Sequence, residues 1–212
     1  MNPLFVDRID AGRQLSKALS HLKGSPDAVS VGLARGGIVP AFVLSRALEI
    51  PLDVIVPRKV GAPFNPELAI AAVTESGAAF FNEELIETLG ITEDLLETEL
   101  KKEKKNAEER LKLYRTVLPA TSFKDKILLL VDDGLATGAT MKASIRAAKD
   151  SGAKEILAVV PVSPPETALE IEASGAGVLT LATPPNFQAV GQFYMHFPPV
   201  EDDEVLSLLK SV

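Results

Sequence analysis

Two adjacent aspartates, Asp132 and Asp133, follow an unbroken aliphatic run and precede the small and hydroxyl residues of GLATGAT, residues 134–140. Small residues let a backbone approach a ligand, and a helix beginning here would direct free amide groups toward the same place. A sugar phosphate would suit both the carboxylates and the free amide groups. Its phosphate would accept hydrogen bonds from the amides, and its hydroxyl groups would donate to the carboxylates. A hydrated Mg²⁺ on that ligand would reduce the repulsion between the two charges. The candidate phosphate-binding residues are Gly134, Leu135, Ala136, Thr137, Gly138, Ala139 and Thr140.

The rest of the sequence predicts a sheet that can position these residues. Short aliphatic runs alternate with helix-length segments, and their continuous hydrophobicity is typical of parallel strands covered on both faces. We therefore expect an α/β fold with a doubly wound, mainly parallel sheet of about five strands, with ligands at the carboxyl ends of the strands. The expected strands are 28–33, 52–57, 126–131, 155–162 and 177–183, and the expected helices are 38–49, 138–151 and 165–174.

Length and composition limit the classes of protein and ligand. The 212 residues predict a single domain, 1–212. No apolar run approaches the ~20 residues of a membrane span, and the amino terminus lacks the pattern of an export signal, so we expect a cytoplasmic protein without a membrane partner. A formal net charge of −7 argues against nucleic acid as a partner and favours a small molecule. With no cysteine and two histidines far apart, any metal would bind to oxygen.

Two segments fall outside the alternation of strands and helices. Residues 58–115 are too long for a crossover and predict an insertion: a flexible loop with extended segments, then a helix from Thr92 to about Arg115. The charge run on that helix is read as a solvated face with ion pairs, or alternatively as a binding surface. The carboxyl-terminal stretch, about 184–212, is rich in aromatic residues and is expected to form a small hood.

The stretch LLLVDDGLATGAT, residues 128–140, resembles the signature of the type I phosphoribosyltransferases, which bind 5-phosphoribosyl-1-pyrophosphate (PRPP). The resemblance implies an enzyme of nucleotide metabolism that transfers the phosphoribosyl group of PRPP, with Mg²⁺, to a nitrogenous base and releases pyrophosphate. Asp132 and Asp133 would hold the ribose hydroxyls, and Mg²⁺ would lie near them through PRPP and water. Ala136 replaces an aspartate typical of hypoxanthine and guanine enzymes, so the motif is more similar to adenine enzymes. Gly134 replaces the usual aliphatic residue, and the base, purine or pyrimidine, stays open.

The same resemblance implies roles for residues outside the motif. Ala34, Arg35, Gly36 and Gly37 match a pyrophosphate loop, in which family members often have a strained peptide. Basic residues near Arg58 and Lys59 contact pyrophosphate in the family, sometimes across the interface of a homodimer; solvated side chains are the alternative for this pair. The flexible loop would close over PRPP, with Glu67, or alternatively Glu75, as the candidate general acid. In the hood, Phe187 or Tyr194 could stack on the base, although ordinary packing explains both aromatic residues as well.

Two other functions remain open. The same fold and PRPP site could serve a non-catalytic protein that senses PRPP or a nucleotide. A hydrolase or phosphatase on the same sheet is a further alternative, but the sequence has neither the G-x-S-x-G pattern nor a cysteine nucleophile.

Overall fold

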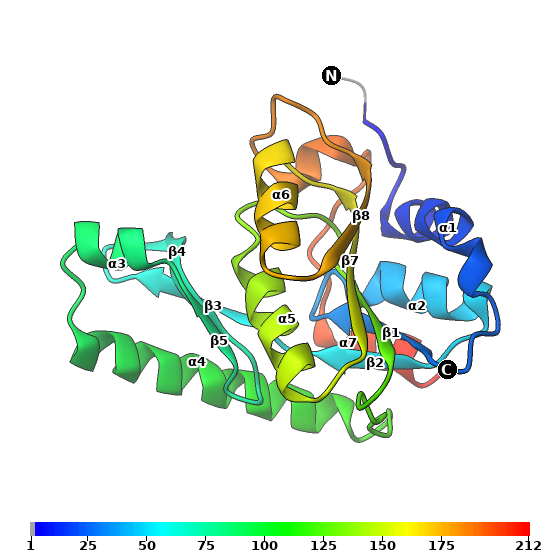
Figure 1. The fold of residues 1–212 in the computed structure, drawn as a ribbon, viewed down its shortest axis with the longest axis horizontal. Coiled ribbons are helices and arrows are strands. Elements are labelled where there is room, and N and C mark those ends of the chain that lie inside the picture. The colour runs from blue at the N-terminus through cyan, green and yellow to red at the C-terminus, as the bar shows by residue number, and fades with distance from the viewer. Residues whose placement is uncertain (1–2) are drawn as a thin grey trace.

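A computed structural model describes residues 3–212, except for the side chains of residues 66 and 67. Its centre is a parallel sheet with the strand order β2-β1-β6-β7-β8 (Figure 1). The α/β class and the five expected parallel strands are confirmed. Their bounds are Ala28–Leu33 (β1), Leu52–Ile55 (β2), Ile127–Val131 (β6), Glu155–Val162 (β7) and Gly177–Ala182 (β8).

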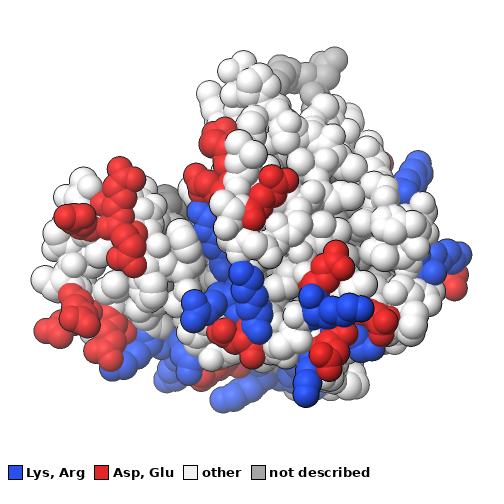
Figure 2. Space-filling model, in the orientation of Figure 1, with Lys and Arg blue, Asp and Glu red and all other residues white. Residues whose placement is uncertain are grey.

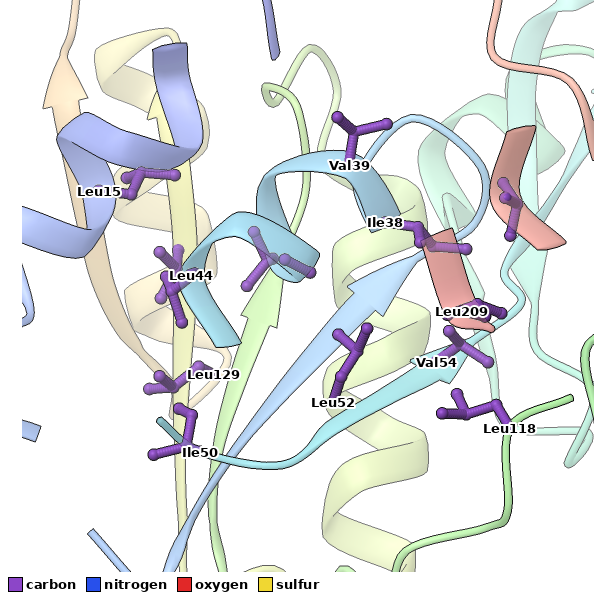
Figure 3. Packing of buried hydrophobic residues seen from close by; sticks show 14 of the residues in the cluster. Leu15, Ile38, Val39, Leu44, Ile50, Leu52, Val54, Leu118, Leu129 and Leu209 are labelled. Atoms are coloured by element: carbon purple, nitrogen blue, oxygen red, sulfur yellow. The ribbon is translucent and has the colours of Figure 1, made fainter. Parts of the chain in front are cut away.

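Helices cover both faces of this sheet. Alternate side chains of each strand point to opposite faces, so each strand packs against helices on both sides. Leu129 and Val131 of β6 pack toward α1, α2 and α7, whereas Leu128 and Leu130 pack toward α5 and α6. Figure 3 shows the first of these clusters, which includes Leu129 of β6 and Leu44 of α2. The helices are Arg8–Ala18 (α1), Ile38–Leu48 (α2), Ala139–Asp150 (α5), Pro165–Ala173 (α6) and Asp202–Leu209 (α7), with short 3-10 helices at Ser20–Leu22 and Val190–Phe193.

The insertion forms a second, antiparallel sheet of order β3-β4-β5 with two helices, and it projects from one side of the main sheet (Figure 1). The sequence predicts its long helix but not the second sheet. The segment GAPFNPEL, expected to be a flexible loop, runs from the end of β3 through the turn into β4. The elements are Arg58–Ala62 (β3), Asn65–Val73 (β4), Ala79–Phe81 (β5), Glu83–Thr88 (α3) and Glu93–Tyr114 (α4).

The charged face of α4 carries ion pairs between residues of the same helix. Lys101 lies 2.7 Å from Glu97, and Lys104 lies 3.0 Å from Glu108, each pair spaced by one helical turn. On the face shown in Figure 2, basic and acidic side chains alternate along the lower edge of the molecule. This arrangement matches the interpretation of the charge run as a solvated face.

A buried ion pair ties the end of the insertion to the main sheet. Asp53 of β2 has no exposed surface, and its carboxylate lies 2.6 Å from the Arg115 guanidinium, directly after α4. The amide of Thr121 donates to the other carboxylate oxygen at 2.7 Å.

In the part of the chain that the structure describes, no helix is both long and apolar enough to cross a bilayer.

Replacing Arg115 by methionine should lower the free energy of unfolding by about 3 kcal/mol, because the buried Asp53 carboxylate loses its counterion. Denaturant unfolding measures the change. The matched control is Arg146→Met, whose pair with Asp150 is exposed and should contribute under about 1 kcal/mol. Equal losses in the two variants would contradict a structural role for the buried pair.

Candidate active site

The acidic pair and the candidate pyrophosphate loop meet at one edge of the main sheet. Strand β1 lies between β2 and β6, and the chain crosses from β2 past β1 to reach β6. Such a reversal of strand order opens a crevice at the carboxyl ends of the strands, where α/β proteins bind ligands. Asp132 and Asp133 follow β6, and residues 34–37 follow β1, so the structure brings together two motifs that are far apart in the sequence.

Two glycines make this approach possible. A Cβ atom on Gly37 would lie 2.4 Å from the Val131 carbonyl oxygen, and one on Gly36 would lie 2.1 Å from an Asp133 carboxylate oxygen. Both distances are shorter than any ordinary contact, so the backbone of this loop packs directly against the acidic pair. The Ala34–Arg35 peptide bond in this loop is cis.

Asp133 is held by an arginine that the sequence analysis does not identify. The Nε of Arg8, in the first turn of α1, donates to Asp133 Oδ2 at 2.7 Å, and both side chains are largely buried. Tyr194 contributes from the hood, where its hydroxyl donates to the main-chain oxygen of Asp133 at 2.6 Å. The backbone amide of Asp133 donates to Asp132 Oδ1 at 2.9 Å.

The environment of the pair raises the pKa of both carboxyls above the ordinary aspartate value. Burial is the largest cause for Asp132, followed by the charge of Asp133, while Lys59 and Arg8 act in the opposite direction. Burial also raises the pKa of Asp133, although the adjacent Arg8 guanidinium opposes the increase. The pair therefore holds protons more tightly in the folded chain than in the unfolded one.

The loop after the pair divides into an anchored part and an open part. Leu135 is buried, and its amide donates to the Val162 carbonyl at 2.9 Å, so this residue fastens the loop to β7. Ala136 and Thr137 are exposed, and Gly138 adopts a φ of 70° directly before α5 begins at Ala139. Helix α5 thus presents its amino-terminal end beside the exposed residues, as an anion site requires.

A cavity of about 460 Å³ adjoins this open part of the loop. Its walls come from the loop, the start of α6, the insertion and the hood, and they include Phe80, Ala136, Thr137, Thr167 and Phe187. This volume lies in the usual range for small-molecule sites. Asp132 and Asp133 lie outside its walls, so a ligand reaching both would extend from this cavity toward the β1 loop.

The candidate basic residues differ in how they are paired. Arg35 lies 2.7 Å from Glu201 at the start of α7, and Arg58 lies 2.9 Å from Glu103 of α4. Lys59 is exposed, and its charge acts on Asp132 across the edge of the sheet. An incoming pyrophosphate could use Lys59 directly, but it would compete with a carboxylate for each arginine.

The two candidate general acids also differ. Glu75 is partly buried and accepts a hydrogen bond from the Val56 amide at 2.8 Å, and burial raises its pKa. The Glu67 side chain lies outside the described part of the structure, so its role stays a prediction.

The hood residues occupy different places. Phe187 lines the cavity, and its ring centroid lies 5.0 Å from that of Phe193, leaving Phe187 as the candidate for stacking on a base. Tyr194 is buried, and its ring packs between those of Phe5 and Phe197. Its hydrogen bond to the main-chain oxygen of Asp133 supports the acidic pair in this structure.

Gly134 accommodates the hood in the place where the resemblance implies an aliphatic side chain. A Cβ atom on Gly134 would lie 2.6 Å from Val190 Cγ1. The Val190 side chain therefore fills the space beside the motif, and only glycine leaves room for it. The sequence carries one signal of this contact, since glycine is unusual at this position of the signature.

The side chains present fit a magnesium ion carried by a ligand better than one caged by the protein. Within the described residues, no group of three or more acidic or histidine side chains could hold a metal. Mg²⁺ commonly keeps several waters and binds one or two carboxylates together with substrate phosphates. Asp132 and Asp133 could contribute to such a site.

The raised pKa values predict how stability depends on pH. Between the ordinary aspartate pKa of ~3.9 and the raised values, the folded state binds more protons than the unfolded state. The free energy of unfolding should therefore fall as the pH rises through this window. Urea titrations at a series of pH values measure it, and Asp132→Asn should flatten the decline. A slope that is unchanged in this variant would argue against the acidic pair as its source.

Replacing Gly134 by alanine should lower the free energy of unfolding by about 1–3 kcal/mol, because the new methyl group overlaps Val190. Thermal and denaturant unfolding measure the loss. The double variant Gly134→Ala with Val190→Ala should recover part of it, since the smaller side chain makes room. If the double variant loses the sum of the two single effects, the proposed overlap is wrong.

The sequence pattern of the family described as "Phosphoribosyl transferase domain" matches residues 6–198. The chain is also 38% identical over 206 residues to a protein of Mycobacterium tuberculosis strain H37Rv that is provisionally named a phosphoribosyl transferase. The match covers 97% of this chain and 46% of that protein, and the same values hold for its counterpart in strain CDC 1551 / Oshkosh. The chain thus spans about half the length of the curated relatives it matches.

Solved structures agree with the fold. The crystal structure of TT1426 from Thermus thermophilus is 37% identical, with a TM-score of 0.82, and the match covers 100% of this chain and 99% of that one. A purine phosphoribosyltransferase from Pyrococcus horikoshii shares the fold at 22% identity, with a TM-score of 0.51 and coverage of 95% and 99%. With the family pattern extending over most of its length, the chain belongs to the phosphoribosyl transferase domain family.

Proposed function

We propose that this chain transfers the 5-phosphoribosyl group of PRPP to a nitrogenous base and releases pyrophosphate in a Mg²⁺-dependent reaction. The observation that carries the proposal is the meeting of three features at the strand-order reversal: the acidic pair, the open phosphate loop and the glycine loop after β1. A ligand with a phosphate at one end and a diphosphate at the other, joined by a ribose, matches their order in space.

In the proposed reaction, the bond between the anomeric carbon and the pyrophosphate oxygen breaks while a nitrogen of the base bonds to that carbon. Positive charge develops on the ribose ring, and the carboxylates of Asp132 and Asp133 would stabilise it while accepting hydrogen bonds from the ring hydroxyls. The base gives the proton on its attacking nitrogen to solvent, and pyrophosphate leaves with the bonding electron pair.

The other residues would position and neutralise the ligand. The amino-terminal end of α5 would hold the 5′-phosphate beside Thr137 and Thr140. Lys59 and Arg35 would stabilise the charge on the departing pyrophosphate. Mg²⁺, when bound with PRPP, would neutralise part of the same charge. In the reverse direction, a glutamate of the insertion, Glu67 or the partly buried Glu75, would be the general acid that returns this proton to the departing base.

The hood and the cavity bear on the choice of base. Phe187 offers a ring face at the cavity wall, so a planar aromatic base would stack there. Ala136 lines the same cavity without a carboxylate, and this favours a base other than hypoxanthine or guanine. Purines that lack the 6-oxo group and pyrimidines both remain in the proposed class.

The proposal predicts that pyrophosphate is released from PRPP and Mg²⁺ only when a suitable base is present. A coupled pyrophosphate assay over a panel of purines and pyrimidines measures this release. Asp132→Ala should reduce it by roughly a hundredfold or more, since a transition-state contact is lost. The matched control Asp150→Ala removes an exposed acid at the far end of α5 and should retain activity.

The same assay separates the proposed enzyme from the alternative sensor. Binding of PRPP, followed by calorimetry, with no pyrophosphate release on any base would favour a protein that senses PRPP. A wild-type protein that neither binds PRPP nor releases pyrophosphate would reject both functions.

A further inference from the structure

Helix α2 has apolar side chains on both of its faces. Of its 11 residues, only Ser45 and Arg46 are polar. Leu44 is buried in the core of the main sheet, whereas Phe42 and Val43, on the other side of the helix, are only half-buried. The outer face of a surface helix usually carries charged and polar residues. An apolar outer face on α2 therefore indicates that another surface covers it.

This outer face of α2 forms a groove of about 530 Å³ together with α1 and α7. Helix α1 packs closely on α2, because a Cβ atom on Gly12 would lie only 2.8 Å from Val43 Cβ. Both helices lie on the side of the main sheet away from the projecting insertion (Figure 1). The side of Ile9 that borders the groove belongs to a residue that is 43% exposed. The apolar lining residues are Ile9, Val39, Phe42, Val43, Ala47 and Leu208.

One end of the groove is basic. Arg13 of α1 and Arg46 of α2 both line it, and both residues are exposed. In the part of the chain that the structure describes, neither side chain makes a hydrogen bond or an ion pair. Two guanidinium groups without a counterion thus lie beside an apolar surface, and they favour a partner that brings carboxylates.

The other end of the same face is acidic. A smaller cavity there shares Ile9 and Val39 with the groove, so the two hollows are neighbours. Glu204 of α7 is exposed, and among the described residues its carboxylate has no ion pair. The guanidinium of Arg8 also borders this cavity, but it is already paired with the acidic pair of the active site. The charged and titratable lining residues are Asp7, Arg8, His196 and Glu204.

The charges give the face a direction. Helix α1 runs from its N-cap Asp7 at the acidic end to Arg13 at the basic end, and α7 runs from Glu204 toward Leu208 in the groove. A two-fold axis through the apolar centre, running across these helices, would turn the acidic end of one copy toward the basic end of the other. It would also bring the two apolar centres together, as in an isologous dimer.

We propose that this face is the interface of a homodimer, in which the outer face of α2 packs against its counterpart and the acidic end of each copy meets the basic end of the other. A second copy supplies apolar, acidic and basic groups in the order that the face requires, whereas a uniformly acidic partner would match only one end. The inference is independent of the proposed reaction, because it rests on the outer surfaces of α1, α2 and α7.

The first test measures the mass of the protein by analytical ultracentrifugation over a series of concentrations. The wild-type protein should form a dimer. Phe42→Asp should raise the Kd of the dimer by roughly a hundredfold or more, because it places an unpaired charge at the apolar centre. The matched control is Leu169→Asp on α6, where the leucine is 65% exposed outside this face, and it should leave the Kd unchanged.

The second test reverses the charges at the two ends. Arg46→Glu and Glu204→Lys should each raise the Kd of the dimer by roughly tenfold, since like charges then face each other. The double variant should recover part of this loss, because opposite charges face each other again. Both residues are exposed, so these variants keep the test available if circular dichroism shows that Phe42→Asp does not fold.

A wild-type protein that remains a monomer at every concentration would overturn the proposal and leave the apolar face to a different partner. A dimer that persists in both Phe42→Asp and Arg46→Glu would overturn it as well, since the contact would then lie elsewhere. A double charge reversal that is weaker than either single variant would contradict the arrangement of acidic end against basic end.

Discussion

The arrangement of this edge of the sheet depends on the burial of two adjacent carboxylates at the end of a strand. Asp132 and Asp133 repel each other and lose hydration, and both effects raise the pKa of Asp132. The Arg8 guanidinium and the Asp133 amide offset part of this cost, and the Tyr194 hydroxyl holds the main chain of Asp133 in place. The acidic pair therefore requires the first helix and the hood to occupy fixed places beside it.

This requirement explains why segments from both ends of the chain meet at the motif. Arg8 and Asp133 are 125 residues apart, and Arg8 and Pro198 are 190 apart, yet one side chain contacts both. The close packing of Gly36, Gly37 and Gly134 has the same origin, because each of these glycines lies where a neighbouring segment leaves no room for a Cβ atom. The site is held by contacts between distant parts of the chain more than by the motif itself.

The sequence predicts well what local pattern encodes. The five strands of the main sheet follow from continuous hydrophobicity, and their order brings Asp132 and the residue 34–37 loop to one edge. Arg8 could not be found in this way, because a single arginine in a helix carries no signal of a partner 125 residues away. The insertion shows the same limit. Register shifts interrupt the pairing of β3 with β4, and hydrophobic and polar residues do not alternate clearly in these strands. The sequence of the insertion therefore indicates extended segments but not how they pair.

The charges at the site bear on why a divalent cation belongs to the proposed reaction. Arg8, Arg35 and Arg58 each lie 2.7–2.9 Å from a carboxylate, so their charges are already largely balanced. Of the candidate basic residues in the described part of the chain, only Lys59 has no ion pair. PRPP brings several negative charges, and one lysine with a helix amino terminus offsets only part of them. The proposed binding of PRPP would then require either that the ligand displace Glu201 and Glu103 from their arginines or that it arrive with its own cation. A Mg²⁺ complex of PRPP would meet this need without breaking the pairs that connect the loop after β1 to α7 and β3 to α4.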